Sequence, residues 1–370
     1  MKKLRLTKFK SLNRKQKNLA GLILIAVIAI IVCLIYFLVN NTTTIKQNLQ
    51  IENINDISKI IIKDKDNRTI ILEKKDNDSW TVNKKFEANK VLISTVLETF
   101  KDMRIREPIP KAARNNVVKD LATMGKTVEV YTMGYAINIG SIKLFKKEKL
   151  EKTYYVGTET PDEMGTFILK KGDNTPYIVH IPNFRGYLSS RFSTIEDLWR
   201  THNVFKYKQS EIESIKVELP NDAKENYTLV NNGNGFSFIT SDGKTLPAFD
   251  TNKVLAFLSS FVEMNYERVA KNIPQVEKDT IFTKAPSFII TLNDKKGKTE
   301  TLKTFVKLSD PTSIAKDDKD FYQIFDVNRC YALSSRYATD TLIMQFFNLD
   351  NVLKPASYFY IGAEGIPLPR

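Results

Sequence analysis

Two stretches of the sequence, EANKVLISTVLETFKDM (Glu87–Met103) and DTNKVLAFLSSFVEM (Asp250–Met264), share the tetrapeptide NKVL. In both stretches apolar residues recur every three or four positions, which is the spacing of one face of an α-helix. We therefore expect two related helices, each buried along one apolar face. The residues expected on these faces are Leu92, Val96, Phe100 and Met103 in the first helix and Val254, Phe257, Leu258 and Phe261 in the second.

Similar segments surround both helices. Short β-branched and aromatic runs, separated by Asn, Asp and Gly turns, precede each helix and more follow it, which predicts strands. The peptide LSSRFST (Leu188–Thr194) returns as LSSRYAT (Leu333–Thr339), at or just after the last strand expected in each half. The sequence therefore predicts an α+β fold with two tandem duplicated modules, residues 56–205 and 206–355, each an antiparallel sheet covered by a helix. Residues 356–370 are expected to form an extended C-terminal tail.

A long apolar run lies near the N-terminus, LAGLILIAVIAIIVCLIYFLV (Leu19–Val39). It has 21 residues without a charge, and 15 of them are Leu, Ile, Val or Phe. As a helix it would be about 31 Å long, which matches a hydrocarbon core of about 30 Å. No small-residue cleavage pattern follows it, so residues 19–39 are predicted to be an uncleaved transmembrane helix rather than a signal peptide.

The basic residues of the chain predict its orientation. The formal net charge is +14, yet residues 1–17 alone carry eight Lys or Arg and no acid, and the rest has 48 basic and 42 acidic residues. By the positive-inside rule, the basic tail 1–18 is expected in the cytoplasm of a bacterial cell. Residues 40–55 then form a linker, and residues 40–370 are periplasmic, outside the inner membrane. Because no basic face remains, no nucleic-acid partner is expected.

Motifs that carry chemistry are missing from the sequence. Its two histidines stand alone, and no HExxH, CxxC, GxSxG or GxGxxG occurs. The three GKT tripeptides, at Gly125, Gly243 and Gly297, lack the upstream glycine of a P-loop, and we expect them in hairpin turns. Cys33 and Cys330 are too far apart in topology to pair. The expectation is a non-enzymatic protein without a cofactor, a metal or an internal disulfide.

Arg191 and Arg336 are the candidate residues for contact with a charged ligand, because they hold the same place in the two LSSR peptides. The alternative is structural: Ser and Arg fasten the corner where each module closes. Because both modules keep the peptide, one shared structural role is simpler than two identical sites.

The segment DLWRTHNVFKYKQSEIESIKVELP (Asp197–Pro220), together with strands such as DISKIIIKD (Asp56–Asp64), resembles one bacterial envelope family. That family is known as a domain of unknown function and is often encoded beside ABC-type transporters associated with gliding motility. The resemblance covers about residues 56–355 and rests on strand patterns. It implies membrane anchoring and partnership with an envelope machine, and it supplies no catalytic residues.

Three functions remain open on the sequence alone. The first is an accessory or scaffold subunit, anchored by one membrane span, that binds other envelope or transporter proteins. The second is a glycan or peptidoglycan binding module at the membrane surface, and the third is an unrecognised hydrolase. An exposed apolar patch or open sheet edge would favour the first, a row of exposed aromatics the second, and a deep pocket with paired acids the third. The sequence does not indicate the partner or the oligomeric state.

Overall fold

The structure, a computed structural model, describes residues 23–33, 49–75, 79–139, 142–233, 235–309 and 325–361. Residues 23–33 are helical and lie within the predicted span 19–39. The rest of that span, the basic tail 1–18, residues 40–48 of the linker and most of the 356–370 tail lie outside the described residues. Among the residues that are described, no helix is both long and apolar enough to cross a membrane.

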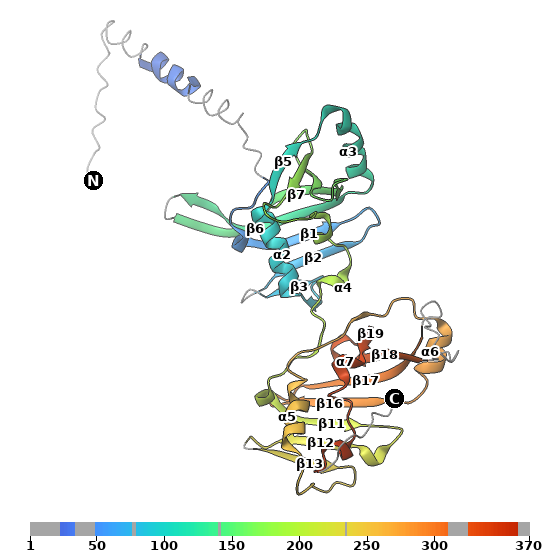
Figure 1. Cartoon of the computed structure of the whole chain (residues 1–370). Coiled ribbons are helices and arrows are strands. Elements are labelled where there is room, and N and C mark those ends of the chain that lie inside the picture. The colour runs from blue at the N-terminus through green and yellow to red at the C-terminus, as the bar shows by residue number, and fades with distance from the viewer. Residues whose placement is uncertain are drawn as a thin grey trace, which may run out of the picture.

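Two antiparallel sheets, one in each half of the chain, form two lobes (Figure 1). The first sheet contains β1 (Ile57–Lys63), β2 (Thr69–Lys74), β3 (Trp80–Val82), β4 (Phe86–Glu87), β5 (Arg104–Pro108), β6 (Lys126–Ile139), β7 (Ile142–Glu159), β8 (Thr166–Lys170) and β9 (Tyr177–His180). The second contains β11 (Ile212–Glu218), β12 (Tyr227–Asn231), β13 (Phe236–Thr240), β15 (Arg268–Val269), β16 (Phe288–Asp294), β17 (Thr299–Leu308), β18 (Phe325–Ser334) and β19 (Thr341–Gln345). The expected mixture of antiparallel sheets and helices is confirmed.

The two sheets have the same strand order. Apart from the edge strand β4, the first runs β3-β2-β1-β6-β7-β8-β9-β5 and the second β13-β12-β11-β16-β17-β18-β19-β15. Even an irregularity recurs: the pairing of β1 with β6 shifts between Ile57 and Lys59, and that of β11 with β16 shifts between Ile212 and Ser214. Every strand of the second sheet therefore has a counterpart in the first.

The main helices α2 (Lys90–Asp102) and α5 (Thr251–Ser259) occupy equivalent places, but their NKVL peptides do not. Asn89 caps α2 and Asp250 caps α5, each accepting backbone N–H bonds. Counted from these caps, the shared tetrapeptide starts two residues later in α5. Consequently Val91 of the first NKVL is 72% exposed, whereas Val254 of the second is fully buried.

Two further helices were not predicted, α3 (Lys111–Thr123) and α6 (Gln275–Ile281), and each starts directly after a proline, Pro110 or Pro274. They pack on the sheet face opposite to α2 and α5 and form small separate clusters. Gly125, expected in a hairpin turn, instead connects α3 to β6. The buried residues of these clusters are Ile109, Val117 and Leu121 in the first lobe and Ile281, Phe305, Tyr331 and Ile343 in the second.

The LSSR peptides lie at different places in the two lobes. The first forms the 3-10 turn η3 (Ser189–Arg191) after β9, the last strand of its sheet. The second runs from the end of β18 into η6 (Ser335–Tyr337), and β19 follows it. Because β18 is the counterpart of β8, the prediction that LSSR closes the second module was wrong. The five-residue strand β19 was not predicted from the sequence; its central residues Leu342, Ile343 and Met344 are buried.

Each lobe begins with a short extended segment held to the end of its main helix. The Ile51 N–H donates to the Phe100 carbonyl at 2.9 Å, and the Tyr207 N–H donates to the Phe261 carbonyl at 2.9 Å. Leu49 is also buried, so part of the predicted 40–55 linker packs on the first lobe. In the same way β10 (Asn203–Phe205), placed in module 1 by the sequence, pairs with β14 (Met264–Asn265) of the second lobe.

The connection between the lobes is built around one buried charge, Arg200. This side chain is 8% exposed and directly follows the short helix α4 (Glu196–Trp199). Its Nη1 donates to Asp340 Oδ2 of the second lobe at 2.6 Å, and its Nη2 donates to Glu196. The guanidinium also lies 3.5 Å over the ring of Phe86 in the first lobe.

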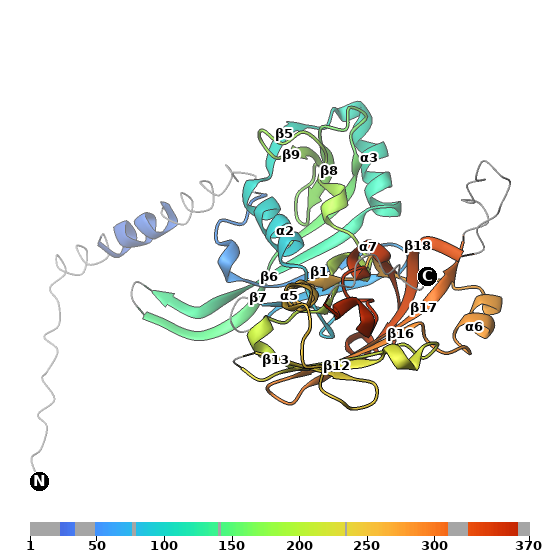
Figure 2. The same cartoon turned by 60° about the horizontal axis from the view of Figure 1, so that its bottom comes forward.

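Other polar contacts fix the same connection on both sides. The Tyr337 hydroxyl donates to the Thr201 carbonyl at 2.8 Å, and the Tyr266 hydroxyl donates to Asp197 Oδ1 at 3.1 Å. Towards the first lobe, the Asn89 N–H donates to the Trp199 carbonyl at 2.8 Å. One apolar cluster includes buried residues of both lobes, among them those that flank this connection: Phe86, Trp199, Val204, Phe205, Tyr266 and Tyr337. Figures 1 and 2 show the two sheets joined at this point.

We predict that Arg200→Met lowers the free energy of unfolding by about 2–3 kcal/mol, because it leaves Asp340, whose side chain is only 16% exposed, without its cationic partner. Urea unfolding of the full-length protein in detergent, followed by tryptophan fluorescence, measures the loss. The control is Arg336→Met, whose ion pair with Glu87 also crosses between the lobes but is longer, 3.6 Å, and 25% exposed on the arginine side. It should lose less than about 1 kcal/mol. Equal losses would contradict the central place of Arg200.

Candidate functional site

The two arginines predicted as ligand contacts have separate partners. Arg191 Nη1 donates to Thr99 Oγ1 of α2 at 2.9 Å, and its guanidinium lies 4.5 Å over the ring of Phe184. Burial lowers the pKa of Arg191 below its ordinary value, against an opposing effect of Glu98. Arg336 instead approaches Glu87 across the connection between the lobes. These contacts suit a role in fastening the fold, while a ligand at either residue stays a prediction.

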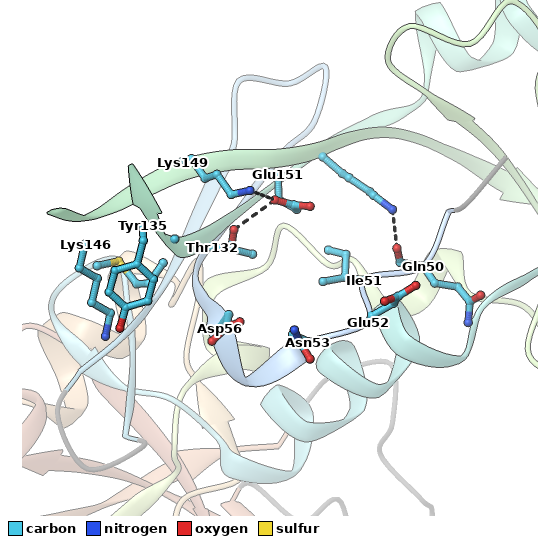
Figure 3. Close-up of a pocket in the computed structure, with 13 residues that line it drawn as sticks. Gln50, Ile51, Glu52, Asn53, Asp56, Thr132, Tyr135, Lys146, Lys149 and Glu151 are labelled. Carbon is cyan, nitrogen blue, oxygen red and sulfur yellow. Dashed lines mark hydrogen bonds and ion pairs between the residues drawn. The ribbon is translucent and has the colours of Figure 1, made fainter. Parts of the chain in front are cut away.

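A hollow of about 600 Å³ lies beside the entry to the first lobe (Figure 3). One wall is the entry segment around Gln50 and Asn53, and the other is the base of the β6–β7 hairpin. Three lysines face three carboxylates there, so the lining has no excess of either charge and does not select an anion. These residues are Lys146, Lys149, Lys152, Glu52, Asp56 and Glu151.

Side-chain bonds line this hollow, and one of them connects its two walls. Lys149 Nζ lies 2.9 Å from Glu151 Oε2, which also accepts a hydrogen bond from Thr132 Oγ1 at 3.3 Å. The Lys152 ammonium donates to the Gln50 carbonyl, so the hairpin is tied to the point where the chain enters the lobe (Figure 3). Burial lowers the pKa of Lys152, and the neighbouring Lys170 lowers it further.

Above this hollow, β6 and β7 continue past the rest of the sheet. β1 pairs with β6 only as far as Thr132, and β8 pairs with β7 only from Tyr154 onward. Residues 133–139 and 142–148 therefore pair only with each other, and we call this two-stranded projection the arm (Figure 2). The sequence reading missed it, although the length of the two strand-like runs was a signal.

A second exposed feature lies on the other lobe, around the short helix α7 (Phe346–Leu349). The Phe347 side chain is 85% exposed, Phe325 47% and Val327 45%. Val327, Phe346 and Phe347 border a hollow of about 460 Å³, whose polar lining is Asn328, Arg329, Gln345 and Asp350. Phe325 lies two residues before Val327 on β18. We call Phe325, Val327, Phe346 and Phe347 the α7 patch.

The described residues offer no group of three or more His, Cys, Asp or Glu side chains placed to hold a metal ion. His202 belongs to the connection between the lobes: its Nε2 lies 2.9 Å from the Asp197 carbonyl, and its ring stacks on Tyr266 with centroids 4.2 Å apart. Burial raises the pKa of Tyr266 well above its ordinary value, and Asp197 adds to this effect. Tyr266 therefore stays protonated and donates to Asp197.

The Asp64 carboxylate lies in the turn after β1, and its surroundings favour its ionised form. It accepts hydrogen bonds from Thr194 Oγ1 at 2.6 Å and from Arg68 Nε at 2.7 Å, and its side chain is 8% exposed. Burial would raise its pKa, but the bonds from Thr194 and Arg68 together lower it from 3.8 to about 2. Since Thr194 ends the LSSRFST peptide, Asp64 fastens that peptide to the first sheet.

Comparison with known proteins gives one match. A family model described as "Domain of unknown function (DUF4340)" matches residues 118–285, which is less than half of the chain. The matched region begins within α3 and ends shortly after α6, the counterpart of α3, so it spans one full structural repeat across the connection between the lobes. It includes residues 197–220, on which the resemblance to a domain of unknown function rests. No curated protein and no solved structure matches the chain.

We predict that Asp64→Asn destabilises the protein at pH 5 and much less at pH 2. Because the folded pKa of about 2 lies below the unfolded value of 3.8, ionised Asp64 stabilises the fold fully above pH 3.8, and this contribution is lost as the pH falls through about 2. Urea unfolding should show a difference on the order of 1–2 kcal/mol at pH 5 that shrinks to a few tenths of a kcal/mol at about pH 2. Asp66→Asn, at a residue in the same turn whose side chain is 74% exposed, is the control. A difference that persists undiminished at pH 2 would show that Asn disrupts the turn for another reason.

Proposed function

We propose that this chain is a single-pass membrane protein of the bacterial envelope that acts, without enzymatic activity, as an accessory or scaffold subunit. Its N-terminus would lie in the cytoplasm, and its two lobes would present a binding surface on the periplasmic side to another envelope or transporter protein. The structure adds one observation that carries this proposal, the α7 patch.

The proposed membrane anchor is supported by the sequence and by the surface of residues 23–33. This helical segment exposes large apolar side chains on all sides, with exposed fractions from 45% to 65% among its Ile, Leu and Val residues. A helix that is apolar all round is suited to the interior of a large protein or to a bilayer. The Lys- and Arg-rich residues 1–17 support the cytoplasmic location of the N-terminus.

The proposed binding function is supported by the chemistry of the α7 patch. Phe347 leaves 85% of its surface in solvent, although burying a Phe side chain is worth about 1.5–3 kcal/mol. Exposed aromatics around a hollow with an Arg, a Gln and an Asp resemble the core and rim of a protein–protein interface. The buried connection between the lobes supports a scaffold role as well, because it gives the surface one fixed shape.

The tryptophans do not supply an aromatic platform for glycan. Trp80 is 7% exposed and Trp199 3%, so both belong to the core. Binding of glycan or peptidoglycan is therefore kept as an alternative outcome of the experiment below.

We predict that Phe347→Glu reduces recovery of the bound partner at least about tenfold, since a charge in an apolar contact costs several kcal/mol. The tagged full-length protein is extracted from its native membrane in mild detergent, and the proteins that stay bound are quantified by mass spectrometry. Val276→Glu is the control, because Val276 is 72% exposed on α6 and does not line the hollow beside α7. It should keep the partner.

Two results would contradict the proposal. The Phe347→Glu variant could keep the same partner in the same amount as the unaltered protein. Alternatively, the protein could be recovered alone and bind isolated peptidoglycan, which would favour the glycan alternative.

A further inference from the structure

We infer that the arm binds the surface of the membrane through anionic phospholipid headgroups. This inference rests on the proposed membrane anchor and adds a second, peripheral contact with the bilayer. The anchor and the arm together would hold the lobes in one orientation above the membrane.

The comparison between the lobes shows that the arm is an addition. In the second lobe the equivalent hairpin turns just after Asp294, and β17 begins at Thr299. Asp294 pairs with Ile212 at the level where Thr132 pairs with Ile57 in the first lobe. From that level the strands of the first lobe run on for the whole length of the arm. Only the lobe that follows the proposed anchor has this extension.

The exposed side chains of the arm combine positive charge with apolar surface. Lys146 and Lys147 are exposed, and neither has an ion-pair partner among the described residues. Phe145 is 74% exposed and Leu144 48%, and Leu150, at the base of the arm, is 46% exposed. Lysines beside an aromatic and aliphatic side chains are typical of segments that lie in the headgroup region of an anionic bilayer.

The backbone at Phe145 adds to this argument. Its φ is +56°, a left-handed conformation that is unfavourable for a bulky residue that is not glycine. No burial within the protein compensates, because the ring is exposed. Insertion of the ring into the boundary between headgroups and acyl chains would bury it, and this burial would offset the cost of the left-handed backbone conformation.

The arm lies within reach of the bilayer. Its base contacts the entry of the chain, through the bond from Lys152 to the Gln50 carbonyl. The predicted span ends at Val39 and the first lobe begins at Leu49, so at most about 35 Å of extended chain separates them. The strand of the arm from residue 142 to residue 148 is itself about 23 Å long. A hairpin of this length can therefore touch a surface to which the lobe is tethered so closely.

The alternative occupant is a protein strand added to the arm, because both its edges are unpaired beyond Thr132 and Tyr154. Lysines along an edge strand oppose such pairing, and β7 has lysines at 146 and 147 in the arm and at 149 and 152 at its base. The lysines and the exposed side chains of Leu144 and Phe145 together favour the lipid surface.

The test uses full-length protein in nanodiscs, with the fluorophore NBD on a cysteine at position 145 in place of Phe145. Cys33→Ser removes the exposed native thiol, and Cys330 stays unlabelled, because burial raises its pKa to about 12 and keeps it protonated. We expect a blue shift of the emission, and quenching by spin-labelled lipid, in nanodiscs that contain phosphatidylglycerol but not in nanodiscs of phosphatidylcholine alone. High salt should reverse the shift, since it screens the lysines.

Lys146→Glu combined with Lys147→Glu should reduce the blue shift and the quenching in nanodiscs with phosphatidylglycerol at least about tenfold, because two charges near the surface are reversed. The matched control is Lys295→Glu combined with Lys296→Glu, in the equivalent short turn of the second lobe, where both residues are exposed. It makes the same change in net charge and should leave the response unchanged.

Three results would overturn the inference, and they are distinguishable. If the protein fails to insert into nanodiscs, the proposed anchor is wrong, and the inference falls with it. If it inserts but the label responds equally in both lipids, or the control variant acts like the arm variant, the anchor stands and the arm does not bind anionic lipid. If the label responds only when a co-purified protein is added, the occupant is a protein strand.

Discussion

The buried guanidinium of Arg200 is the contact on which the arrangement of the two lobes depends. It joins Phe86 and Glu196 on the first side to Asp340 on the second, within a connection whose backbone is bonded to both lobes. A charge taken out of water is tolerated only where its partners stay in place, so this contact disfavours any movement that separates the lobes. The same connection holds Tyr266 and Tyr337, whose hydroxyls donate to Asp197 and the Thr201 carbonyl. The tandem repeat is thereby one body with one continuous apolar core.

Much of the fold could be predicted from local patterns, and the predictions that were wrong failed for physical reasons. Helical periodicity located α2 and α5, because each has one buried face that repeats every three or four residues. The NKVL match led to the right pair of helices with a register two residues off, because burial depends on distance from the N-cap and not on identity. Val91 and Val254 show this, one exposed and one buried. The helices α3 and α6 were not predicted, because few of their residues are buried and only the proline before each marks its start.

The candidate sites depended on contacts that a sequence does not display. Arg191 bonds to Thr99, 92 residues away, and Arg336 meets Glu87 of the other lobe. The shared LSSR peptide suggested one role for both arginines. In the second lobe, however, β19 follows the peptide, whereas in the first lobe the peptide follows the last strand of the sheet. The arm and the α7 patch were missed for a related reason. Exposure of Phe145 or Phe347 is a property of the finished surface, and their apolar type alone predicts burial.

These features describe a protein in which two exposed surfaces, the arm on the first lobe and the α7 patch on the second, are held in fixed relation by the buried connection. A scaffold needs that fixed relation, and a flexible pair of lobes would not provide it. The most direct test is a distance distribution from double electron–electron resonance, with spin labels at Lys119→Cys in α3 and Lys303→Cys in β17, both exposed positions, in the Cys33→Ser protein. We predict one narrow distance distribution in the unaltered connection, which broadens in Arg200→Met. A broad or two-peaked distribution with Arg200 in place would contradict it.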